Sequence, residues 1–234
     1  MNIALDVFLV IFIVLGTYMG ARKGLIKSAI GFVGLVAIVI ISFYLKTGLA
    51  SFLIDKLPFF NFGGSLEGLT SINILVYNII AFVFIFIMLS CVLNIVIAVT
   101  GFIDTLLKFT VIWIIPSKIG GAIIGFLEAW VYIFLVVFIL GQIRVTSSWV
   151  DDSKIGDFIL NHTPVMNTIL GDARDAANEI YAIVKDVEGS SDEEKRDINI
   201  SILQIEMKYN LITKEEVSTL ISTGKLELDG VMFG

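Results

Sequence analysis

The sequence predicts an all-α membrane protein with four transmembrane helices and a small, mostly helical soluble C-terminal tail. Hydrophobic residues make up 57% of the 234 residues and charged residues 16%, whereas soluble domains have about 45–50% apolar and about 25% charged residues. A helix needs about 20 mainly apolar residues to cross a bilayer core, and four stretches provide them. None alternates apolar and polar residues as barrel strands do. The expected helices cover residues 3–19, 25–45, 72–99 and 119–140.

The first apolar stretch is interpreted as a retained helix rather than a signal peptide. Signal peptides have a positively charged segment before the apolar core. Here the chain begins "MNIALDVF", with Asp6 and no basic side chain, and the basic residues follow the core.

The basic residues predict the orientation in the membrane, because cytoplasmic loops are enriched in Lys and Arg. The connection between the first two helices has three basic residues and no acid, and the connection before the fourth helix also has a basic excess. The loop of residues 46–71 is balanced. The cluster of Arg22, Lys23 and Lys27 is therefore interpreted as a topology anchor, and both termini are expected outside the cytoplasm.

A sharp change in composition places a domain boundary near Arg144. Residues 1–144 hold 8 basic and 5 acidic side chains, whereas residues 145–234 hold 8 basic and 17 acidic ones. A net-negative tail has no electrostatic attraction to nucleic acid. The expected division is a membrane domain of residues 1–144 and an acidic soluble region of residues 145–234.

Helix signals recur in the tail. Ser191 with Glu194, and Thr213 with Glu216, have the spacing of a capping box, and Gly224 provides a C-terminal stop. Residues 225–230 are expected to form a short strand. An apolar stripe at helical spacing comprises Ala176, Ile180, Ile183, Val184 and Val187.

Two connecting segments are open to two interpretations. Residues 49–60 are apolar enough for a short interfacial helix, or for a loop packed on the helix bundle. Asp104 and Lys108 are neighbours on one helical face, which favours an amphipathic helix on the inner membrane surface that ends at or just before Pro116. The alternative is that the third helix continues past Thr100.

The sequence contains no motif of a known enzyme class, so a non-enzymatic protein is expected. It lacks a GxSxG motif, a P-loop, HExxH and a dinucleotide fingerprint. Ser90 of the third helix has no membrane histidine to activate it. Because Cys91 and His162 are the only residues of their types, no common metal site and no cofactor are expected.

Small residues four apart form two ladders, one from the end of the first helix into the turn that follows and one opening the fourth helix. Such ladders let helices approach closely in lipid. We expect them to pack, either within the chain or between chains as a homo-oligomer or with other envelope proteins; the alternative is a pore or ligand lining. The ladders are Gly16, Gly20 and Gly24, and Gly121, Gly125 and Ala129.

Charges within membrane helices are costly and indicate function by default. Glu128 lies near the middle of the fourth helix, where it is either a structural carboxyl that holds helices in register or a proton or cation site on a water-filled path. Asp6, near the outer end of the first helix, is expected to reach water. The third helix has polar side chains that qualify as partners of Glu128: Asn73, Asn78, Ser90 and Asn94.

The first helix has an acid near its start and leads into the glycine-rich "GARKGLIKSAIGFVG". A second pattern, "DTLL", is followed by a glycine ladder. In order and spacing these resemble the two signatures of the colicin V production protein (CvpA) family. The sequence departs from the family pattern at Pro116 and at Glu128–Ala129. The matching positions are Asp6, Gly16, Gly20, Arg22, Lys23 and Gly24, then Asp104, Leu106, Leu107, Gly120, Gly121 and Gly125.

The resemblance covers residues 1–140, and the end of the tail looks like the C-terminal module of longer Gram-positive-type members. It implies a bacterial plasma-membrane protein required for toxin production or export. We therefore expect a non-enzymatic oligomer or partner scaffold that supports export or envelope homeostasis. The alternative is a channel or transporter with a glycine-rich pore helix and Glu128 in its path.

Overall fold

The computed structural model describes residues 3–107, 114–184, 189–226 and 228. Within these ranges the chain is helical and has no strand, and four of its helices are long and apolar enough to cross a membrane. The predicted all-α membrane fold is therefore confirmed. The helices that contain these spans are α1 (Ile3–Lys23), α2 (Leu25–Lys56), α3 (Ile72–Leu107) and α4 (Ile114–Gly141); they are followed by α5 (Arg144–Asp151), α6 (Lys154–Asn161), α7 (Pro164–Val184), α8 (Asp192–Lys208) and α9 (Lys214–Ser222).

A single non-helical residue separates the first two helices. Gly24 has a φ of +84°, a left-handed conformation that side chains disfavour, and its amide still donates to the Gly20 carbonyl at 3.0 Å. After this break α2 runs for 32 residues to Lys56. The expected separate interfacial helix over residues 49–60 is therefore wrong, because residues 49–56 continue α2.

The third helix also runs beyond its expected end. It continues as α3 to Leu107, so the alternative interpretation, a continuation past Thr100, is correct as far as the described residues extend. Pro116 does not end a helix, because it lies in the first turn of α4, where its missing amide hydrogen costs no hydrogen bond. Lys108 lies outside the described residues, and the side chain of Asp104 is not among those described.

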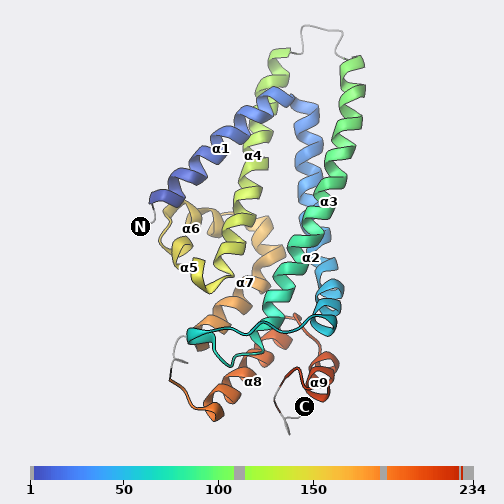
Figure 1. Ribbon diagram of the computed structural model, residues 1–234. Coiled ribbons are helices and arrows are strands. Elements are labelled where there is room, and N and C mark those ends of the chain that lie inside the picture. Colours follow the sequence, from blue (N-terminus) through green and yellow to red (C-terminus); the bar gives the residue numbers. More distant parts are fainter. Residues whose placement is uncertain (1–2, 108–113, 185–188, 227, 229–234) are drawn as a thin grey trace. The chain divides into compact units, whose positions relative to one another are not determined.

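Two compact units divide the chain. The first comprises residues 1–42 and 86–169, and the second comprises residues 43–85 and 170–234. This division does not follow the compositional boundary expected near Arg144. In the first unit α1 packs most extensively on α4, and α5 and α6 pack beside this pair (Figure 1). The beginning of the acidic region thus belongs to the same unit as α1 and α4.

The second unit has its own hydrophobic core, shared by the ends of two apolar helices and the tail. Ile54 of α2 and Ile74 and Tyr77 of α3 pack against Leu203 of α8 and Val217 of α9. The predicted stripe of α7 packs in a second cluster of the same unit, where Ala176, Ile180 and Val184 are buried, whereas Ile183 is half-buried. Val187 lies outside the described residues.

The predicted helix signals in the tail are confirmed. The side chains of Ser191 and Thr213 each accept a hydrogen bond from the backbone amide three residues later. The carboxylates of Glu194 and Glu216 accept from the backbone amides of Ser191 and Thr213 in turn, so both capping boxes are complete. Gly224 follows α9 with a φ of +72°. The expected strand is not present at residues 225, 226 and 228, and the other three of its six residues lie outside the described part.

Candidate functional site

The two small-residue ladders lie against each other in the first unit. We call the contact of Gly16 and Gly20 of α1, together with Gly24 directly after it, with Gly121, Gly125 and Ala129 of α4 the glycine seam. The helices run antiparallel along it. Gly16 lies next to Ala129 and Gly125, Gly20 next to Gly125 and Gly121, and Gly24 next to Gly121.

The seam brings backbone against backbone. A Cβ atom added to Gly125 would lie 2.6 Å from the Gly16 carbonyl oxygen and 2.7 Å from the Cα of Gly20. Real Cβ atoms do not approach other atoms so closely, so only glycine fits here at this helix separation. Lipid tails are as apolar as leucine side chains, so contact between apolar side chains gives helices little advantage over contact with lipid. Close backbone packing is therefore a main source of helix association in a bilayer.

Glu128 faces Lys23 beside the seam. The ammonium of Lys23 lies 3.4 Å from both carboxylate oxygens of Glu128, and the Glu128 side chain is 14% exposed. Gly31 of α2 leaves room for this carboxylate, because a Cβ at Gly31 would lie 3.5 Å from its Oε1 atom. The carboxylate is thus enclosed by α1, α2 and α4 and neutralised by a lysine.

The pairing changes two interpretations made from the sequence. Lys23 belongs to the cluster interpreted as a topology anchor. It also supplies a countercharge for Glu128, although it lies at the end of α1 and not in the middle of a membrane helix. Of the polar residues of α3 in this unit, Asn94 donates instead to the Ser90 carbonyl of its own helix, at 3.0 Å. Arg22 lies over the ring of Tyr18, at 5.9 Å, and Lys27 lies in the first turn of α2.

Asp6 caps α6 rather than simply reaching water. Its Oδ1 atom accepts a hydrogen bond from the Ser153 hydroxyl at 2.5 Å and one from the backbone amide of Ile155 at 3.1 Å. Ser153 in turn accepts from the amide of Gly156 at 2.8 Å. Because a helix N-terminus has free amides and a positive dipole end, a carboxylate is stabilised there. Asp6 thereby attaches the beginning of α1 to the chain that follows α4.

A second contact fixes α6 against α4. The indole of Trp130 donates to the Thr163 hydroxyl at 2.9 Å and lies edge-on to the Phe158 ring, with ring centres 6.2 Å apart. His162, the single histidine, stacks on Phe158, so it completes an aromatic group. Within the described residues, no cluster of His, Cys, Asp and Glu is arranged to hold a metal ion.

In the second unit, side chains of the tail cap the start of α3. Asn199 accepts from the amide of Ser71 at 3.0 Å and donates to the carbonyl of Gly68 at 2.9 Å. Glu206 accepts from the amide of Leu75 at 3.1 Å. Asn199 and Glu206 are seven residues apart, hence on one face of α8. Both are buried.

Glu206 is an unusual group for a structural cap. It is completely buried, and its second carboxylate oxygen has no hydrogen-bond partner among the described residues. Burial raises the pKa of this carboxyl well above its ordinary value, and the bond from Leu75 offsets only part of that effect. The carboxyl therefore tends to hold a proton in the folded state.

The tail also satisfies the end of α2 and a buried lysine. The ammonium of Lys225 donates to the carbonyls of Ile54, Asp55 and Leu57, which a helix leaves free at its C-terminus. Lys46, expected at the start of the loop of residues 46–71, is instead buried in α2. It donates to Asn78 of α3 at 3.1 Å, and Asn78 donates to the Leu211 carbonyl at 3.1 Å.

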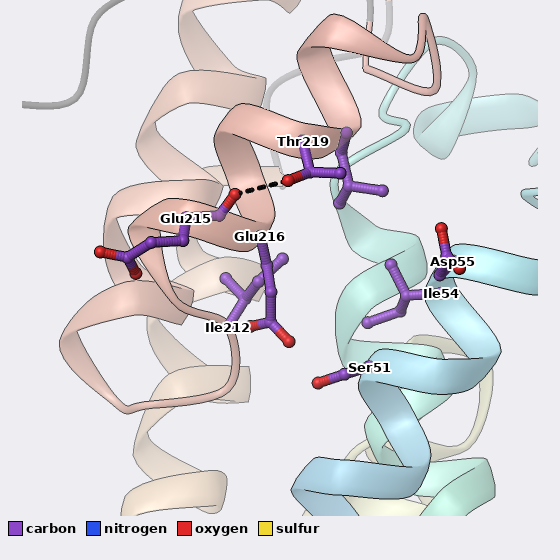
Figure 2. A pocket seen from close by; sticks show the side chains of 8 residues that line it. Ser51, Ile54, Asp55, Ile212, Glu215, Glu216 and Thr219 are labelled. Atoms are coloured by element: carbon purple, nitrogen blue, oxygen red, sulfur yellow. Dashed lines mark hydrogen bonds between the residues drawn. The ribbon is translucent and has the colours of Figure 1, made fainter.

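A pocket of 310 Å³ lies between α2 and α9 in this unit. Figure 2 shows Ser51 and Ile54 of α2 facing Glu216, while the carboxylate of Glu215 points away from α2. Burial pushes the pKa of Glu216 up, but hydrogen bonds from Ser51 and Thr213 outweigh it and leave the pKa below its ordinary value. Both acids that line the pocket already have partners, because Asp55 pairs with Lys56 at 2.7 Å and Glu216 accepts from Thr213 as it caps α9.

Comparison with known proteins supports the resemblance noted in the sequence. A family model described as Colicin V production protein matches residues 5–164. The chain belongs to the colicin V production protein family. A relative in Bacillus subtilis (strain 168), described as the uncharacterized transmembrane protein YshB, is 24% identical over 172 residues, which are 71% of this chain and 94% of that protein. No solved structure matches the chain.

The family match covers one of the two groups of polar contacts. The glycine seam, the pair of Lys23 and Glu128, and the cap formed by Asp6 all lie within residues 5–164. The tail residues Asn199 and Glu206 lie beyond the match.

Sequence reasoning singled out the seam residues, Asp6 and Glu128, but not the partners of the last two. Lys23 was assigned to orientation, because its distance from Glu128 depends on how α1 crosses α4. Asn199 and Glu206 were missed altogether. The available signal was that both interrupt an apolar stretch of α8 with a spacing of seven residues, which places two polar groups on a buried face.

Proposed function

We propose that this member of the family is a non-catalytic scaffold of the bacterial plasma membrane that supports toxin production or export, or envelope homeostasis. In this role it assembles with copies of itself or holds an envelope partner through its helical tail. The observation that carries the proposal is the capping of α2 and α3 by the tail. Lys225 satisfies the last carbonyls of α2, and Asn199 and Glu206 satisfy the first amides of α3.

These contacts favour a scaffold because they hold the tail rigidly against the end of α2 and the start of α3. A tail joined only by a flexible linker would need none of them. Buried polar groups are costly unless paired, so the caps disfavour undocking of the tail. A partner bound to α8 or α9 would therefore be held at a fixed place relative to these helix ends.

A channel is less favoured by the contacts of the seam. Glycines that line a pore would leave their Cα atoms facing an open path, whereas Gly121 and Gly125 lie against the α1 backbone. Glu128 would act best as an ion site if its charge were free. It is paired with Lys23 at 3.4 Å.

The orientation remains part of the proposal, with both termini outside. The cap formed by Asp6 supports a shared side for the beginning of α1 and the chain after α4, as an even number of crossings requires. The test is labelling of Asp152→Cys in a Cys91→Ser background with a membrane-impermeant maleimide on intact cells. Labelling is expected from outside; labelling only after lysis would overturn the orientation.

The function is tested with two experiments on the full-length chain. Liposomes that contain the purified protein are expected to stay tight to ions, with or without osmotic downshock, and flux that changes with Glu128→Gln would overturn the scaffold proposal. Loss of the gene is expected to cause a defect in export or in the envelope, and Asn199→Ala combined with Glu206→Leu is expected not to complement that defect. Ser218→Ala, on an exposed face of α9, is the control and should complement fully.

A further inference from the structure

The outer face of α3 in the first unit holds a polar side chain that has no partner outside its own helix among the residues the structure describes. Asn94 is exposed, and its amide group donates a hydrogen bond to the Ser90 carbonyl one turn earlier. Its side-chain oxygen accepts no hydrogen bond from the described residues, and one amide hydrogen remains unused. Around it the surface is apolar.

Asn94 lies deep in the apolar part of α3. The nearest charged residue further along this helix is Asp104, ten residues or about 15 Å away at the rise of an α-helix. This distance is about half the thickness of a bilayer core. Lipid tails offer no hydrogen bonds, so an amide at this depth is stabilised when another polar group reaches it.

The residues around Asn94 have the spacing of a helix-pairing seam. The exposed positions of this part of α3 include a set at intervals of four, three and four residues, and this spacing allows two helices to cross at a shallow left-handed angle. Cys91 and Ala98 are small, so a partner helix can approach the amide closely. The positions are Ile87, Cys91, Asn94 and Ala98.

We propose that this face of α3 is the interface of a homodimer, in which the Asn94 amides of two copies bond to each other across a two-fold axis. A primary amide is both donor and acceptor, so it is complementary to a second copy of itself. In a parallel pair with its axis along the membrane normal, both copies keep the same orientation in the bilayer. This interface deepens the proposed scaffold function by naming its partner as the same chain.

The glycine seam does not serve this purpose, although such ladders were expected to pack either within the chain or between chains. The Cα atoms of Gly20 and Gly125 face each other within one chain, so this surface is already occupied. The exposed face with a self-complementary polar group is on α3 instead.

The single cysteine gives a direct test in the natural sequence. Cys91 is exposed and lies one turn from Asn94 on the same face, so the dimer brings the two Cys91 thiols together. Native membranes treated with copper–phenanthroline are expected to give a disulfide-linked dimer that a reductant dissociates. The control is Cys91→Ser with Val14→Cys, which moves the thiol to an exposed position of α1 and should give none.

Asn94→Leu distinguishes the proposed contact from random collision. Interhelical hydrogen bonds in membranes are worth about 0.6–2 kcal/mol, so the dimerisation constant in mixed micelles should fall about 3- to 30-fold. Asn94→Gln keeps the amide and should retain more of the dimer. The side chain at position 94 is exposed, so the monomers of both variants are expected to keep their fold, as judged by circular dichroism.

Several outcomes would overturn the dimer. These are absence of the Cys91 dimer in native membranes, equal crosslinking from Val14→Cys, and a dimerisation constant that Asn94→Leu leaves unchanged. A Cys91 adduct to a different protein would also overturn it, because the partner would not be a second copy. None of these results bears on liposome tightness, so failure of the dimer and failure of the scaffold proposal are distinguishable.

Discussion

Replacing Gly125 with alanine should destabilise the membrane helices, although alanine is the better helix former. The added Cβ would lie 2.6 Å from the Gly16 carbonyl oxygen and 2.7 Å from the Gly20 Cα. Both are backbone atoms, so no side chain can rotate away. The two helices must separate by about 1 Å to restore ordinary van der Waals distances.

Two opposing effects set the size of the change. Overpacking of a well-packed contact costs about 1–3 kcal/mol, whereas glycine to alanine within a helix gains up to about 1 kcal/mol from propensity. The matched control is Gly48→Ala in α2, because a Cβ at Gly48 meets nothing within 4 Å. The propensity gain is common to both substitutions, so the difference between them, about 1–3 kcal/mol, reports the seam.

The assay is unfolding by SDS in mixed micelles, followed by far-ultraviolet circular dichroism, for wild type and both variants. Gly125→Ala is expected to unfold at a lower SDS fraction than wild type, and Gly48→Ala at the same or a higher one. Gly125→Leu should lower the midpoint further. Equal midpoints for Gly125→Ala and Gly48→Ala would refute the inference that backbone contact at the seam holds α1 against α4.

Three further predictions follow from the polar contacts. Lys23→Gln and Glu128→Gln should each destabilise the protein by about 1 kcal/mol, with the double variant less affected than the two combined; strictly additive effects in the SDS assay would argue against the pair. Burial raises the pKa of Glu206, so its contribution to stability is fully present below the ordinary value of about 4.5 and is lost as pH rises through the folded-state pKa. Glu206→Gln keeps an acceptor and should flatten the fall of thermal stability as pH rises above about 4.5, and an unchanged pH slope would exclude this carboxyl as its cause. Asp6→Ala removes the cap on α6, worth about 0.5–2 kcal/mol, and should speed hydrogen exchange at Ile155; unchanged exchange would contradict the capping role.

The helices could be predicted from the sequence because apolar run length and capping are local properties. Thr213 and Glu216 form their capping box within one turn, so no distant residue is needed to recognise it. Helix ends were less predictable. Residues 49–56 continue α2 because they pack in the core of the second unit, where Ile54 is buried, and no pattern within the segment distinguishes this from a surface helix.

The charged and polar contacts could be predicted only in part. Asp6 and Glu128 were singled out because a charge in an apolar helix is costly wherever it lies. Their partners, Ser153 and Lys23, are 147 and 105 residues away along the chain. Which residues meet across such separations depends on how helices cross and pack.

The sequence by itself determined that the chain is a multi-pass helical membrane protein with two small-residue ladders, because hydropathy, helical spacing and glycine content are fixed residue by residue. Only the tertiary structure decided that the ladders pair with each other, that Lys23 neutralises Glu128, and that Asn199 and Glu206 of the tail cap α3. The physical reason is that these contacts satisfy backbone and charged groups by bringing together atoms from separate helices. The sequence shows which charged and polar groups require a partner, but the packing of the helices determines which partner each group meets.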